Sequence, residues 1–106
     1  MEERYRTRVT LSSSDNAIVM SISGEPDLGS RKMILDCFGG IEVEEGTLVV
    51  IDLGGAYYLD SEGLKIIIFC GRSVESRGGK MAIVCVGMPK RVITMTKVDQ
   101  LFPVYP

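Results

Sequence analysis

The chain of 106 residues contains no histidine, and this absence excludes much enzyme chemistry. A Ser-His-Asp or Cys-His catalytic group needs an imidazole, and so does a histidine-containing metal site. The three cysteines, Cys37, Cys70 and Cys85, are an odd number without Cys-x-x-Cys spacing, so they predict neither a disulfide framework nor a zinc site. Cys70 and Cys85 lie in apolar runs and are expected in the core. We expect no metal and no cofactor.

Excess charge and long apolar runs are also lacking. Twelve basic and 14 acidic residues leave a formal net charge of -2, which creates no field that would attract nucleic acid or an anionic membrane. The longest apolar runs, 66–70 and 81–86, are far shorter than the ~20 residues that cross a bilayer. Residues 1–6 lack the apolar segment of a signal peptide. We therefore expect a cytoplasmic protein without direct nucleic-acid or membrane binding.

The composition is that of one ordinary globular domain. The chain is 45% hydrophobic and 25% charged, as soluble domains usually are. Its length suits a single domain over residues 1–106, with one hydrophobic core.

The first half of the chain predicts a hairpin and a helix. Residues 5–11 alternate in polarity, and residues 17–23 do the same after a polar turn over 12–16, which is typical of two antiparallel strands. A helix is expected to begin near Asp27 or Ser30 and to end at the glycine pair 39–40.

The second half predicts parallel strands connected by helices. The apolar runs 47–53 and 80–86 read as strands, the first of them buried on both faces, and the amphipathic segment 61–77 between them reads as a helix. Such a connection implies a right-handed crossover and a parallel strand pair. Pro89 is expected to open a last helix that reaches about Lys97, and residues 98–105 to form a closing edge segment. Met88, Val92 and Met95 of this helix are expected to face the core, the alternative being an adaptable apolar surface patch. The fold class is thus α/β: a small mixed sheet with an N-terminal hairpin, central parallel strands and helices packed on one face.

Ser61 stands where the strand 47–53 gives way to the helix 61–77. Chemistry in open α/β sheets gathers at the carboxyl ends of parallel strands. Two interpretations remain open from the residues alone. Ser61 or Asp60 caps the helix, or Ser61 is exposed for modification, since a helix N-terminus accommodates the charge of about -1.5 to -2 that a phosphate adds. A serine-hydrolase elbow is excluded because Leu59 occupies the position of its first glycine.

Several segments together resemble the STAS-domain family, and more narrowly its stand-alone bacterial anti-sigma-factor antagonists. They are Gly24-Glu25-Pro26-Asp27, 49–53, the Asp-Ser-x-Gly-Leu element within 58–64, 77–81 and Leu101-Phe102. The resemblance extends from about Val9 to Tyr105. It implies a non-enzymatic switch whose serine, here Ser61, is phosphorylated by an anti-sigma factor that is also a serine kinase. The unphosphorylated antagonist binds that anti-sigma factor and frees sigma, and a serine phosphatase restores this state. The implied partner-binding residues are Asp27, Asp60, Ser61, Glu62, Gly63 and Leu64.

Two positions depart from the family pattern, and two other functions compete. Glu62 replaces a small residue and adds charge beside the acceptor, and Lys97 stands where many members have glycine. One alternative is a STAS scaffold in a signalling complex that is never phosphorylated. The other is a nucleotide-binding domain, which the absence of both G-x-x-x-x-G-K-[ST] and G-x-G-x-x-G disfavours.

Overall fold

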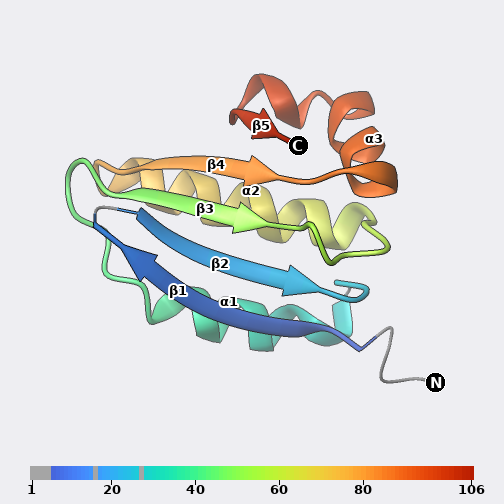
Figure 1. Ribbon diagram of the computed structural model, residues 1–106, viewed down its shortest axis with the longest axis horizontal. Coiled ribbons are helices and arrows are strands. Elements are labelled where there is room, and N and C mark those ends of the chain that lie inside the picture. The colour runs from blue at the N-terminus through green and yellow to red at the C-terminus, as the bar shows by residue number, and fades with distance from the viewer. Residues whose placement is uncertain (1–5, 16, 27) are drawn as a thin grey trace.

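The computed structural model describes residues 6–15, 17–26 and 28–106, and these residues form an α/β domain around a five-stranded sheet (Figure 1). The strands lie side by side in chain order, with the first pair antiparallel and the others parallel. The strands are β1 (Arg8–Ser14), β2 (Ala17–Ser23), β3 (Leu48–Asp52), β4 (Lys80–Val84) and β5 (Val104–Tyr105). The helices are α1 (Arg31–Gly39), α2 (Ser61–Ser76) and α3 (Gly87–Met95), with 3-10 turns at Leu28–Ser30 and Val98–Gln100. The predicted α/β class with a mixed sheet is confirmed.

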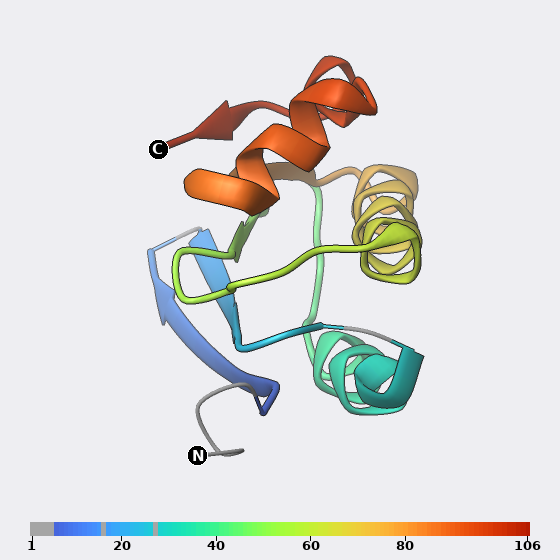
Figure 2. The ribbon, with the colours of Figure 1, turned by 90° about the vertical axis from the view of Figure 1, so that its right-hand side faces the viewer.

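The core lies between the sheet and the two helices α1 and α2, which pack on the same face (Figure 2). The register sets Met20, Ile51 and Ile83 side by side in neighbouring strands, and all three are fully buried. From α2, the residues Ile67, Cys70 and Val74 at helical spacing reach the same core.

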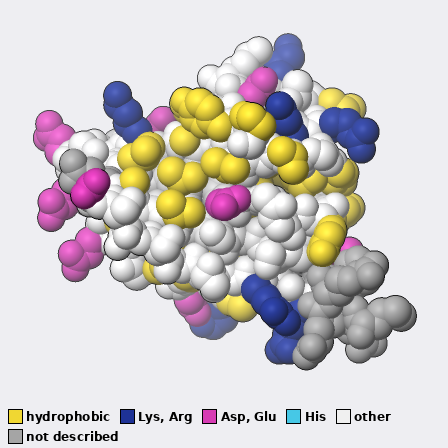
Figure 3. Space-filling model, viewed as in Figure 1, with side chains coloured by type: hydrophobic (Ala, Val, Ile, Leu, Met, Phe, Trp, Pro, Cys, Tyr) yellow, Lys and Arg dark blue, Asp and Glu magenta, His cyan; other side chains and the backbone are white. Residues whose placement is uncertain are grey.

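The opposite face of the sheet is not covered by α1 or α2, so β3 is not buried on both faces as its apolar run predicts. Leu48 is 37% exposed, while Val50 and Asp52 on the same face are half-buried. Figure 3 shows apolar side chains spread over this face around a central acidic group. The reason is topological. Both right-handed crossovers, from β2 to β3 and from β3 to β4, advance in the same direction along the sheet and therefore leave their helices on one side.

Element boundaries differ from the sequence prediction at both ends of the chain. The first strand runs over Arg8–Ser14 instead of 5–11, because its pairing with β2 continues as far as Ser14 opposite Ala17, next to Asp15 at φ 46°. Tyr5, the first residue of the predicted strand, lies outside the described residues. The last helix begins at Gly87 with Pro89 in its first turn, and Met95 at its end is exposed instead of facing the core.

Candidate functional site

Two loops at the carboxyl ends of β2 and β3 hold the start of α2 in place. The peptide N–H of Gly24, just after β2, donates to the carbonyl of Gly55 at 3.1 Å, and the N–H of Tyr57 donates to the carbonyl of Gly24 at 2.8 Å. Within the β3–α2 loop, the N–H of Ala56 donates to the carbonyl of Leu53 at 3.0 Å. These bonds bring the Gly24-Glu25-Pro26 segment beside the loop that leads to Ser61.

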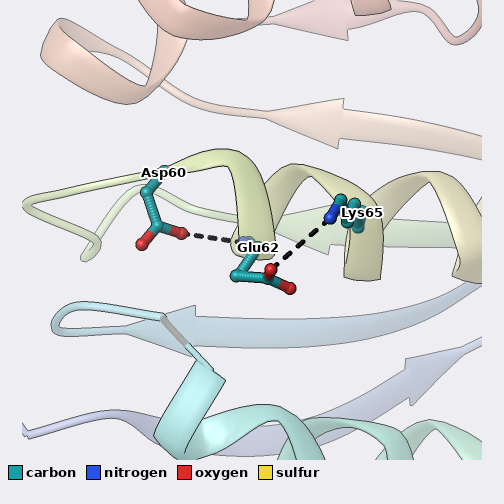
Figure 4. Close-up of polar contacts among 4 residues, drawn as sticks. Asp60, Glu62 and Lys65 are labelled. Atoms are coloured by element: carbon teal, nitrogen blue, oxygen red, sulfur yellow. Dashed lines mark hydrogen bonds and ion pairs between the residues drawn. The ribbon is translucent and has the colours of Figure 1, made fainter.

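Asp60 is the cap of α2. Its backbone is extended, at φ -110° and ψ -173°, and its carboxylate Oδ1 accepts a hydrogen bond from the N–H of Gly63 at 2.9 Å (Figure 4). This side chain satisfies one of the N–H groups that the first helical turn leaves without an intrahelical acceptor. Ser61 is the first residue of the helix and is exposed. The capping interpretation therefore holds in its Asp60 form, and the exposed Ser61 is not the residue whose side chain caps α2.

Glu62 and Lys65 contribute opposite charges to the start of α2. Glu62, in the first turn, lies where a carboxylate is favoured by the helix dipole. Its Oε1 is 3.5 Å from Nζ of Lys65, an exposed ion pair of little stabilising value (Figure 4). Arg31, at the start of α1, lines a shallow groove between α1 and α2 together with Glu62, Lys65 and the apolar side chains Leu35, Ile66 and Phe69.

Gly63 and Leu64 serve the packing of this corner. A Cβ at position 63 would lie 2.7 Å from Cδ1 of Leu59 and 3.1 Å from the carbonyl oxygen of Pro26. Glycine is therefore needed for the first turn of α2 to sit against the segment after β2. Leu64 is 8% exposed and belongs to the core, so little of its side chain is accessible from outside.

The structure brings Asp60, Ser61, Glu62 and Gly63 together on one turn, while Asp27 lies outside the described residues. Sequence reasoning missed the groove residues other than Glu62. Glu62, Lys65 and Phe69 are spaced so that they share one face of a helix, and the side of the groove that α2 forms was therefore detectable from the sequence. The side that α1 forms was not detectable, because only the tertiary fold brings Arg31 to the groove. Tyr57 and Tyr58, just before the cap, are both exposed.

In the described ranges, no three Cys, Asp or Glu side chains are arranged to hold a metal ion. No helix in those ranges has the length and apolar character needed to cross a membrane.

Comparison with known proteins assigns the domain to a family. Residues 8–106 match the model of the STAS domain. The chain belongs to the STAS-domain family. It is 29% identical over 98 residues to the anti-sigma-F factor antagonist RsfB of Mycobacterium tuberculosis, covering 92% of this chain and 80% of that protein. It is 26% identical to an anti-sigma F factor antagonist of Paenibacillus polymyxa, covering 83% of this chain and 77% of that protein.

A solved structure agrees with this assignment over nearly the whole STAS domain. The crystal structure of an anti-sigma factor antagonist from Mycobacterium paratuberculosis superposes with a TM-score of 0.85 at 28% identity, covering 95% of this chain and 86% of that one. The STAS fold expected from the sequence motifs is therefore confirmed.

Proposed function

We propose that this STAS domain is an anti-sigma-factor antagonist switched by phosphorylation of Ser61. In its unmodified state it binds an anti-sigma factor that is also a serine kinase, and thereby releases sigma factor in the cytoplasm. Phosphorylation of Ser61 by that kinase ends the binding, and a serine phosphatase restores it. The domain itself catalyses no reaction.

The single observation that carries the proposal is the division of roles between Asp60 and Ser61. Asp60 caps α2 through its bond to Gly63, so the exposed hydroxyl of Ser61 is not required to hold the helix. A kinase can therefore modify Ser61 without removing a structural contact. The names of the two relatives and of the superposed structure support the class of partner.

The electrostatics of the corner support the direction of the switch. A phosphate on Ser61 adds a charge of about -1.5 to -2 between the carboxylates of Asp60 and Glu62. A docked protein would have to remove water from this anion, which is costly unless it offers cations. The helix N-terminus stabilises the same charge within the domain itself. Binding is thus lost while the fold stays intact.

The first test is the intact mass of the protein after incubation with ATP and a lysate of the source organism. We expect one added phosphate on the wild type and none on Ser61→Ala. The matched control is Ser76→Ala, because Ser76 is also exposed on α2 but lies at its C-terminal end, where the dipole disfavours a phosphate. A phosphate that persists on Ser61→Ala, or none on the wild type beside an active kinase control, would contradict the proposal.

A STAS scaffold that is never phosphorylated is the second candidate, and Glu62 favours it. This carboxylate already places a negative charge next to the acceptor hydroxyl, which opposes the addition of a phosphate there. The scaffold predicts that partner affinity is unchanged by Ser61→Asp, whereas the switch predicts its loss.

A further inference from the structure

The outer edge of β1 lies at one end of the sheet. β1 is the first strand of the sheet, and in the part of the chain that the structure describes no strand pairs with its outer side. All seven of its residues are paired with β2. Natural proteins usually protect such edges with charges, proline or bulges. In β1 only the first residue, Arg8, is charged, and residues 9–14 contain neither charge nor proline. The edge is therefore a long, regular template for another strand.

We propose that two copies of this chain associate through β1, which pairs antiparallel with β1 of the second copy around a two-fold axis at Leu11. The result is one continuous sheet across both copies. This interface lies apart from Ser61, so it stands or falls independently of the proposed phosphorylation switch.

The pairing register follows from the two faces of the strand. Val9 and Leu11 lie opposite Ile22 and Met20 of the core, so odd-numbered residues of β1 point to the helix side. A two-fold axis perpendicular to the sheet keeps that side common to both copies, and side chains that pair across strands share one face. Leu11 opposite Leu11 of the second copy meets this condition and pairs the whole strand, from Arg8 to Ser14.

The backbone groups suit this register. A hairpin with a two-residue loop closes on a hydrogen-bonded pair, here Ser14 with Ala17, and hydrogen-bonded positions then alternate along the strand. The N–H and C=O groups of Val9, Leu11 and Ser13 consequently point to the outer edge. Paired antiparallel around Leu11, they form about six hydrogen bonds between the copies.

The charged and the exposed apolar side chains of β1 also suit this antiparallel arrangement. Antiparallel pairing places Arg8 opposite Ser14 of the second copy and next to its Asp15, so unlike charges meet at both ends of the strand pair. Leu11 is 44% exposed at the axis, beside a hollow that it lines with Ile18 and Ile41. Met33 is 42% exposed, and its helical spacing from Arg31 and Leu35 places it on a different side of α1 from the groove with α2.

Cysteine cross-linking tests the register directly. The hydrogen-bonded pair at the axis has Cα atoms about 5.5 Å apart, within the disulfide range of roughly 4.4–6.8 Å. In a Cys37→Ser background, with Cys70 and Cys85 buried, we expect Leu11→Cys to form a covalent dimer under mild oxidation. The matched control is Leu48→Cys, which is similarly exposed on the uncovered sheet face and is expected to stay monomeric.

Sedimentation velocity of the wild type completes the test. We expect a concentration-dependent monomer–dimer equilibrium that Leu11→Lys shifts to monomer, with an unchanged circular dichroism spectrum showing that the variant folds. A wild type that stays monomeric at all concentrations, together with no preference for Leu11→Cys over Leu48→Cys in cross-linking, would overturn the proposal. A dimer cross-linked through position 48 instead of 11 would overturn it too.

Discussion

Replacing Asp60 with alanine separates the structural role of this corner from its proposed regulatory role. The substitution removes the acceptor of the 2.9 Å bond from the Gly63 N–H. Loss of such a cap costs about 1 kcal/mol of unfolding free energy. In a domain of this size that lowers Tm by about 4–8 °C. Asp60→Asn keeps an acceptor oxygen and loses only the charge at the helix N-terminus, so we expect a smaller loss, within about 0.3–1 kcal/mol.

Ser61→Ala is the decisive comparison in this series. Because Ser61 is exposed and does not cap the helix, we expect its removal to change stability by less than about 0.5 kcal/mol. The assay is urea unfolding followed by circular dichroism, with midpoints compared at an unchanged m value. If Ser61→Ala costs as much as Asp60→Ala, the serine holds the helix and a phosphate there would disturb the fold, which would refute the division of roles.

Three further predictions concern stability, and the same urea assay checks them. Gly71→Ala destabilises by about 1–2 kcal/mol, because its Cβ would lie 2.2 Å from Cζ of Phe102 and the overpacking outweighs the gain in helix propensity; a gain in stability would contradict this packing. Lys97→Gly stabilises by about 0.5–1 kcal/mol, because Lys97 is held at φ 64°, which costs any residue with a Cβ; a loss would show that the lysine side chain contributes more than its strain. Burial raises the pKa of the Cys70 thiol from 9.0 to about 12, so above pH 9 the unfolded chain loses a proton that the folded chain keeps, and stability falls as pH rises from about 9 to about 12. The free energy of unfolding of Cys70→Ala should fall less steeply over that pH range than that of the wild type. Equal slopes for the two proteins would contradict the assignment.

The central elements were predictable from the sequence because local pattern and tertiary packing agree there. The apolar run through Val49 and Ile51 predicts a central strand, and the helical spacing of α2 specifies the face of the helix that packs on the sheet. Whether helices cover the outer face of the sheet was not predictable from one strand. It depends on the direction in which successive crossovers advance along the sheet.

The corner at Ser61 was likewise predictable from the sequence only in part. Its position at the end of β3 followed from the strand-to-helix order, and its family motif from the residues themselves. Which side chain caps α2 did not follow, because aspartate and serine are both good caps and stand next to each other. Only the backbone geometry of Asp60 decides between them. The contribution of Arg31 to the adjoining groove depends on how α1 packs on the sheet, which no local pattern encodes.

We propose that phosphate on Ser61 controls binding to an anti-sigma factor. It is tested most directly by calorimetric titration of each anti-sigma factor of the source organism with two forms of the protein, one unmodified and one with phosphoserine installed at position 61. We expect the unmodified form to bind one of them, and its affinity to become at least about 100-fold weaker, or about 2.7 kcal/mol, after phosphorylation. Equal affinity of the two forms would contradict it.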